Sequence, residues 1–368
     1  MKHKGSSFNE RRRQLLAASG GSLALAGLPA SVRAQSVTIQ ALLNTLLMPE
    51  ALRPMVTQAT NTRVELAPYT SVTDVVAKLL APGGTSRFDL MGTLTNVVRG
   101  PGLGERPGEE KMRALNMALI PNAAGILPSF KGDIITRGGQ TYGLPMAWGY
   151  ESVIYNTERV PPGDGGTQSW RLLFDDKYKG RLAWRDDAHG MIMTAALALG
   201  HKDPVKLAGN DLRDVGKFLI DRKKNIRTMW TKFGEAVGLM ASGEVWAMYG
   251  WVSMRAALRK QGHKVLNNWP RESLLTWSFC ALVPKDAAQA EAAMRVINVM
   301  LSADYGSKLV EATNYPSTSA AAAGTFSKEQ WAERGLDIDQ HGIPLYGFDL
   351  PAAMDQWVET WNTVRAAT

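Results

Sequence analysis

The chain is poor in the residues that build disulfide frameworks and metal sites. Its 368 residues include one cysteine, Cys280, and five histidines. A single cysteine excludes a disulfide within the chain, so the folded state has to be stabilised by the burial of apolar surface. Cys280 lies in the apolar run 277–283, where a thiol is expected to pack as a small buried hydrophobe.

Motifs of common enzymes and metal receptors are also absent. The sequence has no Gly-x-Ser-x-Gly element, no phosphate-binding loop of the Walker type and no His-Glu-x-x-His motif. No two tyrosines are adjacent, which excludes the tyrosine pair that some iron receptors use. Asp186 and Asp187 are adjacent, but neighbours in an extended segment point to opposite sides, which makes them poor acid-base partners. We therefore expect no catalysis, no metal ion and no cofactor.

A basic surface for nucleic acid is not indicated, although the net charge is +8. Residues 1–34 contain six Lys or Arg and one Glu, so the rest of the chain carries only +3. The densest charged run outside that segment, 221–224, has no interleaved aromatic residue and is typical of the exposed end of a helix. We expect no nucleic-acid partner.

The first 34 residues have the three parts of an export signal. A basic segment ends at Arg13, a mildly apolar run covers 15–30, and Val32-Arg33-Ala34 forms a small-x-small cleavage site. The apolar run is too short to span a bilayer. The consecutive arginines followed by Gln-Leu-Leu resemble a twin-arginine signal, and Arg33 favours that route over ordinary secretion, which stays the alternative. We expect cleavage after residue 34 and a monomeric protein in the periplasm.

The remainder of the chain alternates short apolar segments with segments of amphipathic helical spacing, which is typical of α/β proteins. Strands are expected at 37–43, 63–67, 88–91, 141–146, 152–155, 180–184, 245–249, 264–267 and 275–283. Helices are expected at 50–59, 72–80, 170–174, 190–199, 212–223, 232–241, 253–261, 288–301 and 352–365, with a loop at 100–108.

This alternation predicts two α/β lobes, each a sheet flanked by helices. The chain is expected to cross between the lobes near 148–152 and again near 272–277, so that each lobe is built from discontinuous segments. These crossings assign residues 35–150 and 277–320 to lobe 1, and residues 151–276 and 321–368 to lobe 2.

Several short motifs follow one another in a fixed order along the chain. They are Phe88-Asp89-Leu90, Tyr142-Gly143-Leu144-Pro145-Met146-Ala147-Trp148-Gly149, Ser169-Trp170-Arg171-Leu172-Leu173-Phe174, Lys177-Tyr178-Lys179-Gly180-Arg181-Leu182, Asp186-Asp187-Ala188, Ser242-Gly243-Glu244-Val245, Asn268-Trp269-Pro270-Arg271-Glu272 and Asn314-Tyr315-Pro316. Together they resemble the bacterial spermidine/putrescine-binding proteins, the periplasmic components of polyamine ABC importers. The resemblance implies a two-lobed solute-binding fold of type II, which closes on a small solute by hinge motion and is then recognised by a membrane permease.

The resemblance also implies which residues contact the ligand. Proteins of that family hold amines with carboxylates and stack aromatic rings on the methylene chain, because a buried ammonium needs a charged or aromatic partner. Asp187 matches an amine-binding Asp, Trp251 and Trp277 match stacking rings, and Tyr249 is a further candidate. Structural alternatives stay open, since Asp187 would also suit the cap of the next helix and the two tryptophans would suit a core.

Three positions depart from the family pattern. Gly190 stands where the family has a carboxylate, and Phe279 stands where it has an Asp. Asn96 replaces an aromatic residue of the first lobe and is a candidate for either ligand contact or helix capping. Arg185, directly before the Asp pair, would repel a polycation, unless it is only a surface residue.

The loss of two of three carboxylates predicts a ligand that is smaller or less cationic than spermidine, because a buried ammonium without a partner is strongly unfavourable. A monoamine, an amino-acid-like zwitterion or an aromatic organic cation would fit. In the zwitterion hypothesis Asp187 binds the amine and Arg185 binds the carboxylate. A true putrescine or spermidine receptor is the alternative, and a periplasmic enzyme or metal-binding receptor on the same fold is the second.

Overall fold

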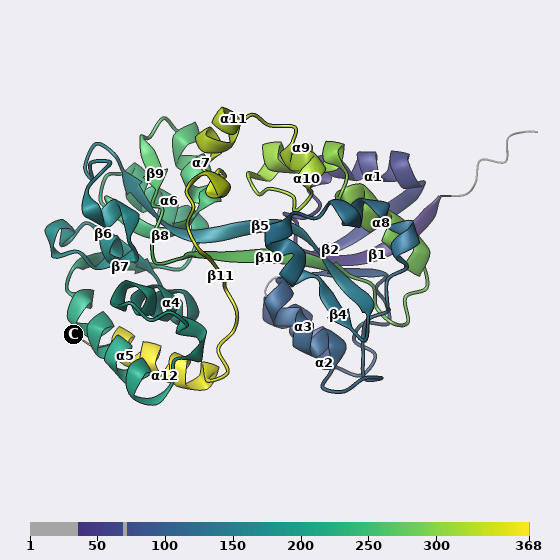
Figure 1. Ribbon diagram of the computed structural model, residues 1–368, viewed down its shortest axis with the longest axis horizontal. Helices are drawn as coiled ribbons and strands as arrows, with labels where there is room; N and C mark the ends of the chain where they lie inside the picture. Colours follow the sequence, from purple (N-terminus) through teal and green to yellow (C-terminus); the bar gives the residue numbers. More distant parts are fainter. Residues whose placement is uncertain (1–35, 69–71, 368) are drawn as a thin grey trace, which may run out of the picture. The chain divides into compact units, whose positions relative to one another are not determined.

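A computed structural model describes residues 36–68 and 72–367 (Figure 1). The expected export signal lies outside the described residues, so its cleavage site and the twin-arginine route stay predictions. Within the described ranges, no helix combines the length and apolar character needed to cross a membrane.

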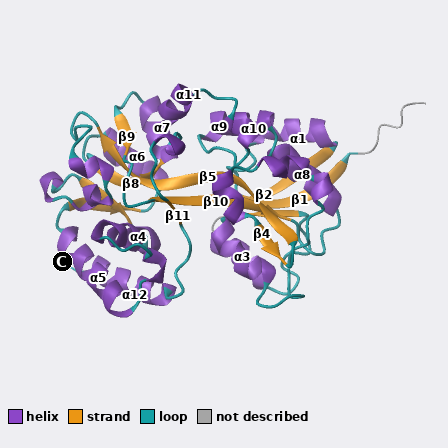
Figure 2. Ribbon diagram, viewed as in Figure 1, coloured by secondary structure: helices purple, strands orange, loops and turns teal. Residues whose placement is uncertain are grey.

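The observed elements follow the predicted alternation of strands and helices (Figure 2). The strands are β1 (Val37–Leu43), β2 (Thr62–Pro68), β3 (Leu90–Gly92), β4 (Ile135–Arg137), β5 (Gln140–Asn156), β6 (Leu182–Arg185), β7 (Ile226–Trp230), β8 (Ala247–Trp251), β9 (Val265–Asn267), β10 (Leu274–Leu282) and β11 (Leu345–Gly347). The helices are α1 (Arg53–Thr60), α2 (Val72–Leu80), α3 (Thr95–Leu103), α4 (Ala188–Leu199), α5 (Gly209–Lys223), α6 (Phe233–Ala241), α7 (Val252–Lys260), α8 (Ala290–Met300), α9 (Ala303–Thr313), α10 (Ala320–Ala323), α11 (Lys328–Arg334) and α12 (Met354–Ala366). The α/β fold class is confirmed.

Strand β5 is longer than the sequence pattern predicts. The two short strands expected on either side of Trp148-Gly149 are one continuous strand of 17 residues. Its side chains are buried on both faces from Tyr142 to near its end, so the strand lacks the polar alternation that would have revealed its length. Gly149 pairs with Trp277 inside the strand and leaves room for its ring: an added β-carbon would lie 2.5 Å from the ring.

The two long strands β5 and β10 connect the sheet. Among the described residues the main hydrogen-bonded path runs β2-β1-β3-β10-β5-β8-β6-β7, with β4, β9 and β11 pairing beside it. β5 and β10 are antiparallel, with Glu151 opposite Leu275 and Gly143 opposite Leu282. The predicted crossing segments are therefore strands of one network. The lobe boundaries at 150/151, 276/277 and 320/321 stay a prediction.

The prediction of a loop at 100–108 was wrong at its start. Helix α3 continues to Leu103 with Pro101 inside it, and ends at Gly104, whose φ is 70°. Pro101 stands in the last turn, so it interrupts little of the helix, and buried Val98 and Leu103 hold α3 against the core.

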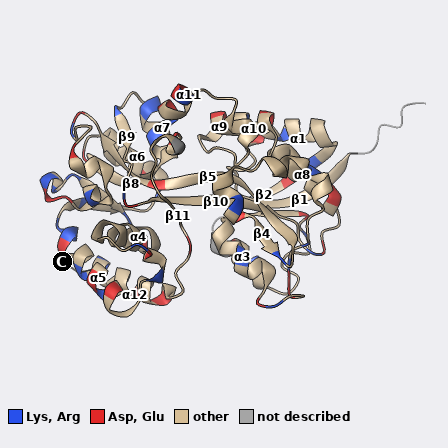
Figure 3. Ribbon diagram, in the orientation of Figure 1, with Lys and Arg blue, Asp and Glu red and all other residues tan. Residues whose placement is uncertain are grey.

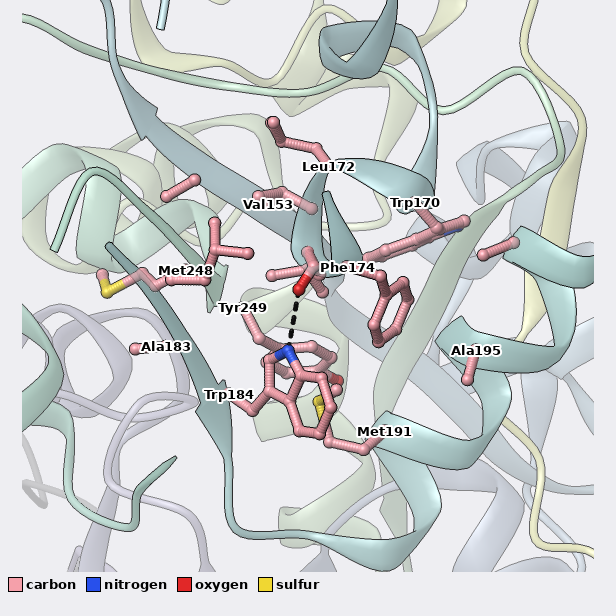
Figure 4. Packing of buried hydrophobic residues seen from close by; sticks show 14 of the residues in the cluster. Val153, Trp170, Leu172, Phe174, Ala183, Trp184, Met191, Ala195, Met248 and Tyr249 are labelled. Carbon is pink, nitrogen blue, oxygen red and sulfur yellow. Dashed lines mark hydrogen bonds between the residues drawn. The ribbon is translucent and has the colours of Figure 1, made fainter. Parts of the chain in front are cut away.

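One buried cluster surrounds α4, a helix whose residues from Ala188 to Ala198 are all buried. Figure 4 shows Trp184, Tyr249 and Met191 packed together here, and the Trp184 Nε1–H donates to the carbonyl of Leu173 at 2.8 Å. A helix that is apolar all round is expected where helices or strands cover every side. The cluster therefore gives α4 a rigid setting, which fixes the position of its N-terminus.

The other buried clusters lie along β1, β3 and β10. Cys280 belongs to one of them, is fully buried and, as predicted, acts as a small hydrophobe, with burial raising the pKa of its thiol to about 12. Lys and Arg residues are interspersed with Asp and Glu residues along the outer helices (Figure 3). Many form pairs within one helix, as Arg295 does with Glu291, and such exposed pairs add little stability.

Candidate functional site

The N-terminus of α4 carries the first predicted site residues. Asp187 is the N-cap of the helix, and its Oδ2 accepts the backbone N–H of Gly190 at 3.0 Å. The same oxygen lies 3.3 Å from Nη1 of Arg185, the last residue of β6. The structural alternative for Asp187 is therefore correct, and the residue is at the same time one half of an ion pair. A carboxylate at this helix end is favourable electrostatically.

Arg185 is held between Asp187 and an aromatic ring. Its guanidinium carbon lies 4.8 Å from the centre of the Trp251 ring, which in turn meets Trp230 edge to face at 5.5 Å. Burial opposes the charge of Arg185, but Asp187, Tyr249 and Glu151 outweigh it and raise the pKa of the guanidinium. Arg185 is therefore a paired, partly buried residue rather than an exposed one, and its contact with a solute stays a prediction.

Glu151 is a buried carboxylate that the sequence analysis missed. It lies in β5, opposite Trp251 of β8 and Leu275 of β10, and only 2% of it is exposed. Its Oε1 accepts the indole N–H of Trp277 at 2.9 Å, while its buried Oε2 makes no hydrogen bond of normal geometry to a described residue, although the Tyr249 hydroxyl and the Trp251 indole are near enough to lower the pKa of the carboxyl. Burial raises the pKa of Glu151 to about 7, and Arg185 is the main group that opposes this rise. The available signal was a single carboxylate inside the predicted crossing segment.

Tyr249 of β8 occupies the space next to Gly190. The tyrosine is fully buried, and its hydroxyl lies near Glu151 and Arg185 without a hydrogen bond of normal geometry to a described residue. A β-carbon added to Gly190 would lie 2.5 Å from that hydroxyl oxygen and 3.1 Å from Oδ2 of Asp187. A carboxylate at position 190 would therefore collide with Tyr249. We refer to Glu151, Arg185, Asp187, Tyr249 and Trp251 as the Arg185 cluster.

Trp277 lies beside this cluster on β10. Its ring lies against Gly149, and its neighbours are Phe279 at 5.3 Å and Tyr315 at 5.4 Å between ring centres. Trp277 is partly exposed, whereas Phe279 is buried in the core beside it. Phe279 therefore lies in the core, whereas Trp277, for which the core was the alternative to a ligand contact, keeps an accessible part.

Asn96 lies at the start of α3 and borders a cavity of about 270 Å³. Its side-chain amide donates to the carbonyl of Phe348. In the same cavity the Ser278 hydroxyl donates to Oδ2 of Asp133 at 2.6 Å, and burial raises the pKa of this carboxyl. We call this cavity the Asn96 pocket. Its lining consists of Thr95, Asn96, Arg99, Gly132, Asp133, Thr276, Trp277, Ser278, Gly347, Phe348 and Asp349.

The segment 347–349 connects the Asn96 pocket with the start of α4. The rings of Phe348 and His189 stack at 3.9 Å, and the His189 Nε2 lies 2.7 Å from the carbonyl oxygen of Asp349. Trp277 forms a second link, since it lines the pocket and also donates to Glu151. The predicted residues of α3, β8, β10 and the α4 start therefore lie in one connected region.

The charges of this region differ from those expected from the family pattern. Three carboxylates that the sequence analysis did not count are present in it, those of Asp133, Glu151 and Asp349. Together with Asp187 they stand against Arg99 and Arg185. The missing carboxylates at positions 190 and 279 are thus offset in number by groups on other elements. Within the described residues no three His, Cys, Asp or Glu side chains are placed to hold one metal ion.

Comparisons with known proteins identify the family. Residues 52–335 match the family described as bacterial extracellular solute-binding protein. The spermidine/putrescine-binding periplasmic protein of Escherichia coli (strain K12) is 26% identical over 237 residues, which cover 61% of this chain and 64% of that protein, less than two thirds of its length.

Solved structures show the same fold. One is a spermidine/putrescine ABC transporter protein from Listeria monocytogenes, with a TM-score of 0.73, 20% identity, and coverage of 90% of this chain and 100% of that chain. Another is the structure titled Atu4243-GABA receptor, with a TM-score of 0.70, 19% identity, and coverage of 90% and 98%. With the family match over more than half of its length, this chain belongs to the bacterial extracellular solute-binding proteins.

Proposed function

We propose that this chain is the substrate-binding component of an ABC importer, and that its solute is a small amine, an amino-acid-like zwitterion or a related organic cation. The observation that carries the proposal is the convergence of the Arg185 cluster, Trp277 and the Asn96 pocket. The cavity of about 270 Å³ is lined by Trp277, Arg99, Asp133 and Asp349, and Trp277 connects it through Glu151 to the charged groups and rings of the Arg185 cluster. Solute sites combine an apolar wall with a few placed polar groups in this way.

The chemistry of the region supports a ligand with an amine. Carboxylates outnumber arginines, and the rings of Trp251 and Trp277 offer faces against which a cation or a methylene chain can pack. The relatives support it as well, since the E. coli protein is named for spermidine and putrescine and one structural neighbour for GABA. The small cavity favours a solute of a few carbon atoms.

The same proposal gives the protein its place and partner. The matched E. coli relative is a periplasmic binding protein rather than an enzyme, and we infer that this chain is exported, remains monomeric and catalyses no reaction. Solute contacts on both sides of the crossing strands would favour a closed form, which a membrane permease then recognises.

A binding screen tests this function. The chain from residue 35 to 368 is heated with putrescine, spermidine, γ-aminobutyrate, common amino acids, opines, choline-type cations and aromatic amines, and calorimetry follows for each hit. A solute at ~100 times its dissociation constant stabilises the protein by about 2.7 kcal/mol. A shift with a monoamine or zwitterion supports the proposal, and tight spermidine binding favours the polyamine alternative. A screen with no shift, or turnover of a bound solute, contradicts it.

A further inference from the structure

We propose that Glu151 is a specificity-determining residue of this receptor: it leaves the Arg185 cluster with one more negative than positive group, so that the site accepts one positively charged group and disfavours a solute carboxylate. The inference rests on the proposed function. It goes further because it names the residue that selects the solute and the net charge that is selected.

The strand register places Glu151 on the same face as the aromatic site residues. Side chains alternate along a strand, and residues opposite each other on neighbouring strands share a face. Glu151 is opposite Trp251, and Tyr249 precedes Trp251 by two residues on β8. On β10, Trp277 follows Leu275, the residue opposite Glu151, by two. The hydrogen bond from the Trp277 indole to Glu151 is consistent with this shared face.

The hydrogen bonding of Glu151 is incomplete. Its Oε1 accepts the neutral indole N–H of Trp277. The Tyr249 hydroxyl and the Trp251 indole lie near enough to the carboxyl to lower its pKa, but neither Oε2 nor the Tyr249 hydroxyl makes a hydrogen bond of normal geometry to a described residue. Buried polar groups with incomplete hydrogen bonding are unfavourable unless a further partner is present. An ammonium or guanidinium group would supply the N–H donors that Oε2 lacks, which explains a carboxylate at a core position.

The charged groups around Glu151 decide the charge balance of the Arg185 cluster. Among the described residues, Arg185 on β6 is the cation that most affects the pKa of Glu151, and Asp187 at the start of α4 already pairs with that arginine at 3.3 Å. The remaining titratable neighbours are hydroxyls, Tyr249 from β8 and Tyr315 from the segment after α9. One arginine therefore faces two carboxylates, which leaves it poorly suited to hold a solute carboxylate. This favours a monoamine over a zwitterion.

The balance depends on pH in a way that can be measured. Burial raises the pKa of Glu151 to about 7, so the carboxyl is largely protonated at pH 6 and largely ionised at pH 8. A cation beside Oε2 favours the ionised form, so binding at pH 6 releases a proton from Glu151. Affinity for a cation should therefore rise roughly tenfold from pH 6 to pH 8.

Three solutes with a four-carbon chain and different charge provide the test. Calorimetry at pH 6 and pH 8 compares putrescine, 4-aminobutanamide and γ-aminobutyrate, which carry two, one and no net positive charges. The wild-type protein is expected to bind 4-aminobutanamide at least tenfold more tightly than γ-aminobutyrate at pH 8. In Glu151→Gln, which keeps the shape but not the charge, this preference should fall to threefold or less and the pH dependence should disappear.

Two further variants complete the experiment. Glu272→Gln is the matched control, because this partly buried glutamate also has an oxygen without a hydrogen bond. Its other oxygen accepts the Ser169 hydroxyl, away from the Arg185 cluster. The Glu272→Gln variant should therefore bind the three solutes as the wild-type protein does. Arg185→Gln should shift the preference toward putrescine, and it decides the question if Glu151→Gln does not fold. If Glu151→Gln keeps the wild-type order of affinities for the three solutes and the wild-type pH dependence, this inference alone is overturned. The same outcome in Arg185→Gln overturns it if Glu151→Gln does not fold. Silence of the wild-type protein with all three solutes would count against the proposed function too.

Discussion

The Arg185 cluster and the Asn96 pocket are neighbours with opposite construction. In the Arg185 cluster the charged groups come from strands β5 and β6 and from the N-cap of α4, and aromatic rings pack against them. In the Asn96 pocket the polar groups come from the start of α3, from the end of a short helix at Asp133 and from the segment 347–349, around an open cavity. The cluster therefore concentrates charged groups on regular elements, and the pocket is lined largely by segments outside them. We infer that the Arg185 cluster selects the charge of the solute and that the Asn96 pocket selects its shape.

Removing Trp277 should have the largest effect, because this ring joins the two regions. Trp277→Ala leaves Gly149 uncovered and takes the hydrogen-bond donor away from buried Glu151. We expect a loss of about 4 kcal/mol in the free energy of unfolding and loss of solute binding. Chemical denaturation measures the first and calorimetry the second. Trp277→Phe is the control, since it keeps a ring but not the donor and should lose about half as much stability; equal stability of all three proteins would contradict the link.

The next effect concerns the Arg185 cluster alone and follows from the raised pKa of Glu151. The pKa of the folded state is about 7, above the usual 4.5, so the folded protein binds the proton more tightly than the unfolded chain. The corresponding stability is complete below pH 4.5 and is lost as the pH rises through 7. Relative to Glu151→Gln, wild-type stability should fall by on the order of 3 kcal/mol between pH 4.5 and pH 8 without solute. Parallel curves for the two proteins would show that Glu151 does not titrate as a buried group.

Much of this cluster was predicted from the sequence, for a physical reason. Asp187 belongs to one of the ordered motifs and stands directly before an apolar helical pattern, and Trp251 and Trp277 each follow such a motif at a position that matches a stacking ring of the family. Glu151 was missed because its partners belong to β6, β8 and β10, which only the folded sheet brings together. The role of Gly190 was equally hidden, because it depends on where the Tyr249 hydroxyl ends.

The pocket was hardly predictable. Asn96 was identified, but its partner is the carbonyl of Phe348, 252 residues away, and a backbone carbonyl has no sequence signature. Asp133 and Asp349 stand in irregular segments without a motif. For the fold, helix and strand types followed from apolar periodicity. The continuity of β5 did not, because burial on both faces removes the alternation that marks a strand.

A smaller effect separates the capping role of Asp187 from its charge. Asp187→Ala should lower the free energy of unfolding by about 1 kcal/mol, because the N–H of Gly190 loses its acceptor. Asp187→Asn keeps a capping oxygen and should lower the free energy of unfolding by only a few tenths of about 1 kcal/mol. Both variants should bind an amine solute about tenfold more weakly if the charge matters. Full affinity in Asp187→Asn would mean that the residue is only a cap.

The smallest effect is expected in the Asn96 pocket. Asn96→Ala removes the hydrogen bond to Phe348 and should reduce stability by about 1 kcal/mol or less. Hydrogen exchange should become faster for the amides of 345–349, while those of α5, which has no contact with the pocket, serve as the internal control. Unchanged exchange in 345–349 would show that Asn96 does not hold this segment. The contrast between the Arg185 cluster and the Asn96 pocket would then lose its support.

The most direct test of the proposed solute site is a crystal structure of the protein with the solute that binds best in the screen. We expect the positively charged group of the solute to lie within hydrogen-bond distance of a carboxylate of the Arg185 cluster. The carbon chain of the solute should pack against Trp277, and its other end should enter the Asn96 pocket. A solute bound away from Trp277, or one whose charged group contacts neither Glu151 nor Asp187, would contradict it.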